Sequence, residues 1–565
     1  MDNFIRKTEL LSPVTLWDGF DASLPLKESK VNEEVYDNIV YSHMYFFGRD
    51  TRQGRVRIYG VYARNKSVKK KSPKAGLLII PDVGKTVDTD IVNVYVKQGY
   101  AVLMIDYSGE SPDLEHYTKY PECVSYANYL KVGRAMDHCD ETAEKTAWYE
   151  WVAVARYGIS FLRSQFELEK VGVLGIKSGA DIGWMVCGTD RRVDCFVPLF
   201  GMGWRTYRGV YKYSDKEMAV DDEKLRFLAA VDSHAYVQYV TCPIFYMTAT
   251  NSADFDCDRA MDTLMRFKGQ SLYLNLSPRA DKVLDLSCKS DIDIFLAKYL
   301  LGFKVTMPAL PKINITCKEK YATATVELDF SDLLRPKNVT VYLAEDGENP
   351  AFRDWVIMAP LKGNEENKKS FGSEMIGNSN FVNVFAVAEY KNGVTVSSLM
   401  TCKKIPKTPS RKLNLVYSSN DKTSSFAASY PEKVALGGLF FEDQKPVIFV
   451  EGSNKICGVG SEYGLISYKF NVRKVELNER SLIVMDVNTE RYSLLKVTLV
   501  LEENGKATDY DFSIALSGGG IWQHVIIRCC DFKSPKRISI KDYSAVSAMK
   551  LESGSLCIFN NILII

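Results

Sequence analysis

The chain has 565 residues, too many for one hydrophobic core, so we expect three or four domains. Its apolar fraction of 46% and charged fraction of 25% are those of a globular protein, and 72 basic residues nearly balance 70 acidic ones. The resulting net charge of +2 gives no field that would favour nucleic acid or an anionic membrane, and we expect neither as a partner.

The N-terminal segment and the cysteines bear on location. Residues 1–17 carry acidic side chains and lack a continuous apolar core, so no signal peptide is predicted. No apolar run reaches the roughly 18 to 20 residues of a membrane span. The 13 cysteines contain no C-x-x-C pair and are typical of reduced thiols. The sequence therefore predicts a cytoplasmic protein with no metal site and no cofactor.

The first domain is predicted over residues 1–306, where apolar strands alternate with helical segments. A long helix with apolar residues at helical spacing is expected over 145–165. Strands that are apolar throughout and separated by helices imply a mostly parallel sheet covered by helices on both faces. The predicted strands lie at 56–64, 75–80, 101–105, 171–176, 195–200, 242–250 and 271–276.

Two all-β domains are predicted to follow. Residues 307–408 contain short alternating strands, two of which are joined through Asn392 and Gly393, a strong hairpin signal. A unit of this length and pattern predicts an immunoglobulin-like or fibronectin-like sandwich. Residues 409–565 are again rich in strands, and their length and strand number predict a jelly-roll sandwich.

The stretch "VGVLGIKSGADIGW" at 171–184 has the pattern of a buried strand, a tight glycine turn and a helix start. Many hydrolases present a nucleophilic serine on such a turn, in the frame G-x-S-x-G. Here the frame is Gly175-Ile176-Lys177-Ser178-Gly179. Lys177 therefore occupies the nucleophile position, and Ser178 is the residue that follows it.

Together with "LLIIPDVGKT" at 77–86, "GYAVLMIDYSGE" at 99–110 and the segment 231–256, this stretch resembles the α/β-hydrolase superfamily, in particular its dienelactone-hydrolase and acetylxylan-esterase branch. The resemblance covers the first domain. It implies an oxyanion loop at 77–86 and a triad in the chain order nucleophile, acid, histidine.

The triad that the resemblance implies is incomplete. An amine that attacked an ester would leave an amide, so turnover at Lys177 would stall. Ser178 is expected to help cap the helix, since its side chain leaves the turn in another direction. At the acid position the nearest carboxylate is Asp254, and the loop after the last strand contains Asp281 but no histidine. The chain resembles carboxylic ester hydrolases without a recognisable Ser-His-Asp triad, which leaves open whether it is an enzyme.

Three roles for Lys177 stay open. A carboxylate such as Asp254 can hold it in an ion pair that fills the pocket. The ammonium group can instead bind an acidic ligand. Alternatively, the positive end of the helix dipole and burial can lower the pKa of Lys177, and the neutral amine can form a Schiff base.

Candidate ligand-binding residues come from two places. The segment 198–213 is predicted to overhang the pocket, with Trp204, Arg205, Tyr207 and Arg208 placed to stack on sugar rings and hold a carboxylate, or simply to pack as a lid. In the last domain, "GGGIWQHVIIRCCDFK" around Trp522 looks similar to carbohydrate-binding jelly rolls. A buried tryptophan explains that motif equally well.

Three functions therefore compete. The first is a catalytically degenerate hydrolase-like protein that recognises a carbohydrate or an acidic saccharide. The second is an active carboxylesterase or deacetylase acting on acylated glycans. The third is a structural protein whose domains scaffold a homo-oligomer.

Overall fold

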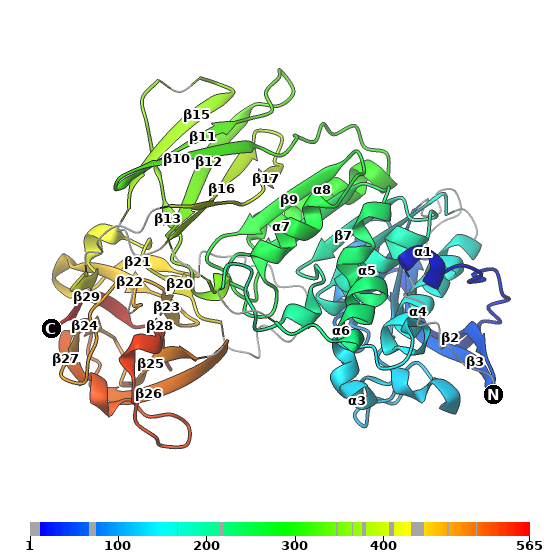
Figure 1. The fold of residues 1–565 in the computed structure, drawn as a ribbon, viewed down its shortest axis with the longest axis horizontal. Helices are drawn as coiled ribbons and strands as arrows, with labels where there is room; N and C mark the ends of the chain where they lie inside the picture. Colours follow the sequence, from blue (N-terminus) through cyan, green and yellow to red (C-terminus); the bar gives the residue numbers. More distant parts are fainter. Residues whose placement is uncertain are drawn as a thin grey trace, which may run out of the picture.

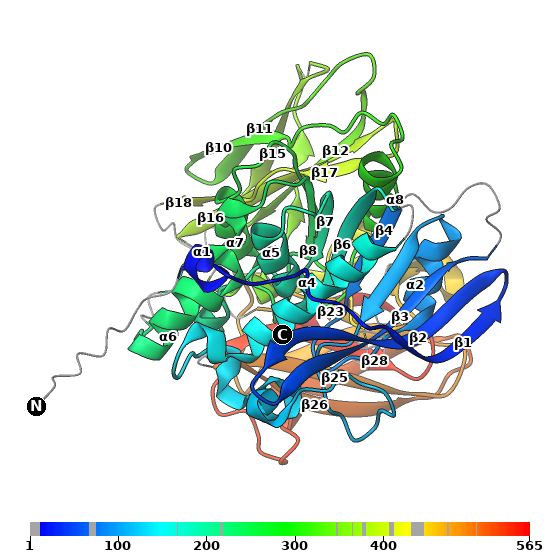
Figure 2. The ribbon, with the colours of Figure 1, turned by 90° about the vertical axis from the view of Figure 1, so that its right-hand side faces the viewer.

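The computed structural model describes residues 12–66, 75–165, 168–214, 218–345, 348–363, 365–375, 380–405, 412–430, 446–471, 474–503 and 505–565. Three domains follow one another in these ranges (Figure 1), and Figure 2 shows the second of them above the first. Within the described ranges, every helix is too short or too polar to span a bilayer.

The first domain is built on a nine-stranded sheet of order β1-β2-β3-β5-β4-β6-β7-β8-β9. The pairs from β5 to β9 are parallel, whereas β1, β2 and β3 form an antiparallel arm that joins the sheet at β5. The order, with its crossover at β5-β4, is that of an α/β-hydrolase sheet, which confirms the predicted fold class. The strands are β1 Ser29–Tyr36, β2 Ile39–Thr51, β3 Gly54–Asn65, β4 Ala75–Ile80, β5 Ala101–Ile105, β6 Lys170–Ile176, β7 Cys195–Leu199, β8 Ile244–Ala249 and β9 Leu272–Ser277.

Helices cover both faces of this sheet. Along β4, Leu78 and Ile80 belong to a core formed with α4, α5 and α7, whereas Leu77 and Ile79 belong to a core formed with α2 and α8. This alternation follows from the period of two along a strand, and it explains why the strands are apolar throughout. The helices are α2 Thr89–Lys97, α4 Ala147–Ser164, α5 Ser178–Thr189, α7 Cys257–Met265 and α8 Leu286–Leu300.

The second domain is a sandwich of two antiparallel sheets. One sheet has the order β10-β11-β15-β14, and the other has the order β13-β12-β16-β17 with β18 also paired to β16. This distribution is the one expected for an immunoglobulin-like sandwich. Its strands are β10 Lys312–Lys318, β11 Tyr321–Glu327, β12 Pro336–Ala344, β13 Val356–Ile357, β14 Ala359–Pro360, β15 Lys368–Glu374, β16 Phe381–Tyr390, β17 Thr395–Ser397 and β18 Thr401–Lys404.

The third domain is also an antiparallel sandwich. Strands β22 to β29 pair as β22–β29, β23–β28, β24–β27 and β25–β26, which is jelly-roll connectivity, and the two sheets share one apolar core. The strands are β19 Leu415–Tyr417, β20 Ala427–Ala428, β21 Ile448–Glu451, β22 Cys457–Gly460, β23 Leu465–Ser467, β24 Leu482–Asn488, β25 Ser493–Glu503, β26 Lys506–Leu516, β27 Trp522–Arg528, β28 Val546–Ser553 and β29 Ile558–Ile564.

The second domain covers the edge of the large sheet. The hydroxyl of Ser397 on β17 accepts a hydrogen bond of 2.9 Å from the backbone N–H of Leu276 on β9, so this edge strand is capped by another domain. Next to it, the buried carboxylate of Asp291 on α8 accepts hydrogen bonds from the Thr395 N–H at 2.9 Å and from the Asn275 amide at 2.7 Å. A carboxyl group therefore lies inside the contact between the two domains.

Burial raises the pKa of Asp291 to about 8, although both hydrogen bonds favour the charged form. The folded state then binds this proton more tightly than the unfolded state does. As the pH rises above about 4, Asp291 therefore lowers the free energy of unfolding by a growing amount, and this decrease is complete above about pH 8. We expect Asp291→Asn to flatten the fall in stability between about pH 5 and pH 8. Urea unfolding across this range measures the slope, with the exposed Asp113→Asn as control; an unchanged slope would contradict the assignment.

Residues 349–355, here called the strap, tie the second domain to both others. Arg353 makes a two-point ion pair with Asp258 on α7, at 2.6 and 2.5 Å, and both side chains are almost fully buried. The next residue, Asp354, is paired at 2.8 Å with Lys474 of the third domain, again in a buried position. Burial alone would raise the pKa of Asp354, but the charges of Lys474 and Arg279 outweigh it and leave the pKa lowered.

Candidate functional site

The turn between β6 and α5 retains the geometry of a nucleophile elbow, with Lys177 at its apex. Lys177 has φ 52° and ψ −112°, a backbone conformation that residues other than glycine rarely adopt. The neighbouring glycines permit close packing: a Cβ on Gly175 would lie 2.6 Å from the Cα of Ala180, and one on Gly201 would overlap the carbonyl oxygen of Lys177. The strained turn is therefore present although the residue on it is a lysine.

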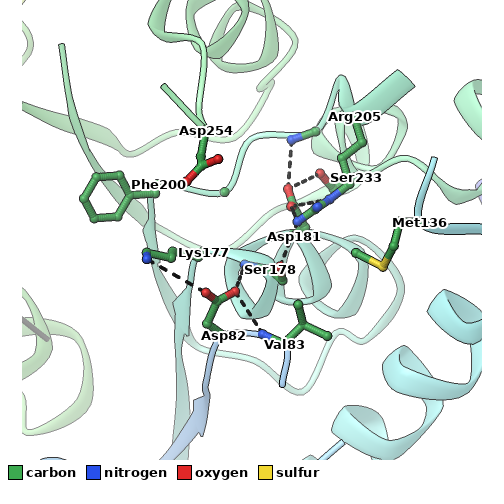
Figure 3. Close-up of polar contacts among 12 residues, drawn as sticks. Asp82, Val83, Met136, Lys177, Ser178, Asp181, Phe200, Arg205, Ser233 and Asp254 are labelled. Atoms are coloured by element: carbon green, nitrogen blue, oxygen red, sulfur yellow. Dashed lines mark hydrogen bonds and ion pairs between the residues drawn. The ribbon is translucent and has the colours of Figure 1, made fainter. Parts of the chain in front are cut away.

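The oxyanion donors of this elbow are occupied by a side chain of the protein itself. The carboxylate of Asp82 in the loop after β4 accepts hydrogen bonds from the Ser178 N–H at 3.2 Å and from the Val83 N–H at 2.9 Å (Figure 3). In hydrolases of this fold, the N–H after the nucleophile and an N–H of this loop stabilise the oxyanion. Asp82 places its own carboxyl group where that transient negative charge would form.

Lys177 is paired with the same carboxylate. Its Nζ lies 3.9 Å from Asp82 Oδ2, and the two side chains keep 22% and 25% of their exposure. A partly solvated pair at this distance contributes no more than about 1 kcal/mol. The expectation that a carboxylate such as Asp254 holds Lys177 is wrong about the residue, because the partner is Asp82 and Asp254 is paired with Arg208 at 3.0 Å.

Ser178 is buried and bound through its hydroxyl. Its Oγ accepts a hydrogen bond of 2.9 Å from the guanidinium of Arg205, so the expectation that it caps α5 is wrong. Arg205 also binds Asp181 at 2.6 Å, and Asp181 accepts from Ser233 Oγ at 2.8 Å (Figure 3). Burial raises the pKa of Asp181, and the charge of Arg205 opposes this. A guanidinium offers no acceptor for a proton, so the group bound to the Ser178 hydroxyl cannot act as its base.

The loops after β8 and β9, which carry the acid and the histidine in hydrolases of this fold, bind the strap in this protein. In the loop after β8, the amide of Asn251 donates to the carbonyl oxygens of Ala351 and Arg353, at 3.1 and 2.8 Å. In the loop after β9, the guanidinium of Arg279 donates to the Trp355 carbonyl, with Nε at 2.7 Å. Both loops therefore hold the strap of the second domain.

The contacts that the structure shows for the five histidines are with residues other than Lys177 and Ser178. His234 stacks on Trp204 with ring centroids 4.0 Å apart, and its Nδ1 lies 2.9 Å from Asp232. His524 lies on β27 of the third domain beside Asp486. The other three contact Tyr59, Tyr45 and Asp137. The histidine role that sequence reasoning found missing is not filled by a distant histidine in this structure.

A cavity of about 140 Å³ lies beside the elbow, under residues 202–211. Four predicted ligand-binding residues, Trp204, Arg205, Tyr207 and Arg208, line it, as does Asp254. Further carboxylates belong to Asp137, Asp181 and Asp256, and the third guanidinium is that of Arg259. Burial, followed by the charge of Asp258, raises the pKa of Asp256 to about 6. Cations and carboxylates thus nearly balance around the cavity.

The aromatic side chains of this segment are engaged in packing. The Trp204 indole stacks on His234 and donates through Nε1 to Thr263 at 2.9 Å, and the guanidinium of Arg266 lies 5.0 Å from its ring. Arg259 lies 4.2 Å from the ring of Tyr207. Trp522 is half-buried at the start of β27, where its Nε1 donates to the Ser453 carbonyl at 3.0 Å. Their sugar-binding role stays a prediction.

Both other domains touch the segment over the cavity. The hydroxyl of Tyr211 accepts a hydrogen bond of 2.8 Å from Asn349 of the strap. At the β25–β26 hairpin of the third domain, a Cβ on Gly505 would lie 2.7 Å from the carbonyl oxygen of Gly209. The cavity is thus roofed by a segment that the second and third domains hold in place.

Comparisons with known proteins find similar solved structures, but no matching family model and no matching curated protein. Among solved structures, an acetyl xylan esterase from Paenibacillus sp. is 15% identical, with TM-score 0.39, over 51% of this chain and 92% of that one. A second, from Thermoanaerobacterium sp., is 12% identical, with TM-score 0.37 and the same coverage. A cold-adapted esterase from an Arctic intertidal metagenomic library is 14% identical, with TM-score 0.33, over 48% and 97%.

Proposed function

We propose that this protein is a catalytically degenerate hydrolase-like protein that recognises a ligand, a carbohydrate or an acidic saccharide, instead of hydrolysing an ester. The observation that carries the proposal is the Asp82 carboxylate bound to the Ser178 and Val83 N–H groups. These donors stabilise an ester's oxyanion only when they are free. An anion held there repels the negative charge that hydrolysis would develop.

The chemistry of the neighbouring residues supports the same proposal. Lys177 stands at the nucleophile position, Ser178 is bound by a cation, and the loop after β9 has Arg279 anchoring the strap. Restoring hydrolysis would therefore need a nucleophile, a base and free donors at once. The alternative of an active carboxylesterase is not favoured.

The ligand part of the proposal is supported by the open edge of the cavity. Arg208 and Asp254 form a surface pair whose side chains are 63% and 55% exposed. Such a pair is worth little, so a ligand carboxylate or hydroxyl can replace Asp254 on Arg208 at low cost. The volume of about 140 Å³ lies below the usual range of about 300 to 1,000 Å³ for ligand pockets, so only one end group fits there.

Acetyl release from aryl acetates and acetylated xylan tests the proposal directly. We expect no turnover from the wild type or from Lys177→Ser, because in the latter Asp82 still occupies the oxyanion donors and no base is supplied. In the double variant Asp82→Ala/Lys177→Ser, the Ser178 and Val83 N–H groups are free. We expect this variant to release acetate only slowly, because it still lacks a general base. Ser178→Ala is the matched control: wild-type turnover that disappears in Ser178→Ala would overturn the proposal.

A second candidate, a structural or oligomer-scaffolding protein, is favoured by one observation. Asn251 and Arg279, in the loops that carry triad members in hydrolases, hold the strap. The catalytic face of the fold is thereby turned into a joint between domains. Titration with saccharides separates this candidate from the first, because a scaffold would bind none of them.

A further inference from the structure

A second and larger hollow lies between the first and second domains. This groove has a volume of about 640 Å³, within the range of about 300 to 1,000 Å³ typical of ligand pockets and well above that of the cavity beside the elbow. Domain junctions are frequent places for such sites. The groove shares no lining residue with the cavity, so it is a separate feature.

One wall of the groove is formed by strands of the second domain and the other by a helix of the first. On β12, Val341 and Leu343 point into the core of the sandwich, while the alternate residues Asn338, Thr340 and Tyr342 line the groove. On the neighbouring β16, Glu389 lies opposite Asn338 and also lines it. The other wall is α8, which contributes residues one turn apart, Leu286, Lys289, Ser290 and Asp293.

The composition of these walls selects the ligand. Hydroxyl and amide groups alternate with carboxylates, which matches a molecule whose hydroxyls both donate and accept hydrogen bonds. Three carboxylates, those of Asp285, Asp293 and Glu389, face one ammonium group, that of Lys289, so an anionic ligand is disfavoured. The ring of Tyr342 is held by stacking on Phe385, with centroids 5.1 Å apart, and gives the groove one rigid aromatic contact.

We propose that this groove binds a neutral oligosaccharide. The proposal rests on the proposed function for its ligand class, and it places the main saccharide contacts between the first two domains. Glu389 accepts from ligand hydroxyls, Asn338 and Thr340 exchange hydrogen bonds with them, and the ring of Tyr342 supports one sugar face.

Calorimetric titration of the full-length protein with xylotetraose, cellotetraose and maltotetraose tests the proposal, with a galacturonic acid oligomer as the anionic comparison. At least one neutral tetrasaccharide should bind, and more tightly than the anionic one. Thr340→Trp, which fills the groove, should abolish binding. Glu389→Gln should weaken it about tenfold, because a hydrogen bond to a charged acceptor is lost.

The matched control is Lys337→Gln. Lys337 forms an ion pair with Glu389 at 2.5 Å but does not line the groove. Lys337→Gln therefore removes the same ion pair as Glu389→Gln while it keeps the Glu389 carboxylate, and the affinity for the saccharide should be unchanged. If Arg208→Gln weakens binding and the groove variants do not, the groove proposal fails and the cavity remains as the site of the proposed function. If no tetrasaccharide binds, the groove proposal and the carbohydrate part of the proposed function both fail, while the ester assay still decides the loss of hydrolysis.

Discussion

Replacing Arg353 by methionine is expected to lower the free energy of unfolding by about 3 to 5 kcal/mol, because the change leaves the carboxylate of Asp258 buried without its partner. Both side chains of this pair are almost completely inaccessible, and a second carboxylate, that of Asp256, is close enough to repel the first. Denaturation by guanidinium chloride followed by fluorescence measures the effect.

Two further variants separate the lost ion pair from general damage. Arg353→Met/Asp258→Asn should recover a large part of the loss, since it removes the orphaned charge along with its partner. Arg335→Met breaks an exposed pair with Asp332 in the same domain and should change stability by less than about 0.5 kcal/mol. A loss below about 1 kcal/mol in the single variant would show that the pair is solvated in solution.

The second large effect is expected at the elbow, where Gly179→Ala should cost about 3 kcal/mol or more. A Cβ at this position would lie 2.7 Å from the carbonyl carbon of Ile80 and closer still to the oxygens of Ile80 and Pro81. These are backbone atoms of the adjacent strand β4 and its loop, which cannot rotate away as a side chain can. Thermal unfolding of the purified variant measures the loss.

Gly554→Ala is the matched control, because a Cβ there would meet open space and the backbone lacks a positive φ. If Gly179→Ala is as stable as this control, the close approach of α5 to β4 is not required. If it is destabilised as expected, packing alone preserves the glycine frame of the elbow. The frame would then persist in a protein whose catalytic residues are gone, and would be no evidence of activity.

The fold could be predicted from the sequence because its signals are local and repeated. The run at 171–176 is apolar throughout because that strand is buried on both faces of the sheet. The strands of the second domain alternate between apolar and polar residues because only one face of each sheet is buried. The position of Lys177 on the turn came from spacing along one short stretch. Strand number and length indicate a sandwich for the third domain, but not its pairings, which join strands as far apart as β22 and β29.

The contents of the site could not be predicted in the same way. Asp82 and Ser178 are 96 residues apart, and the hydrogen bond between them depends on two loops meeting at one end of the sheet. The one available signal was a charged residue, Asp82, two positions after the end of β4. Asp254 follows β8 in sequence, which predicts the acid position, but its loop carries it to the cavity edge and Arg208. The strap partners Arg353 and Asp258 left no pattern at all.

The strap also has a consequence for how the protein is made. Asn251, Asp258 and Arg279 belong to the first domain, and their partners in the strap come 76 to 102 residues later in the chain. During synthesis these polar groups stay in water until the ribosome has released residue 355. The first domain therefore completes these contacts only after this part of the second has been synthesised.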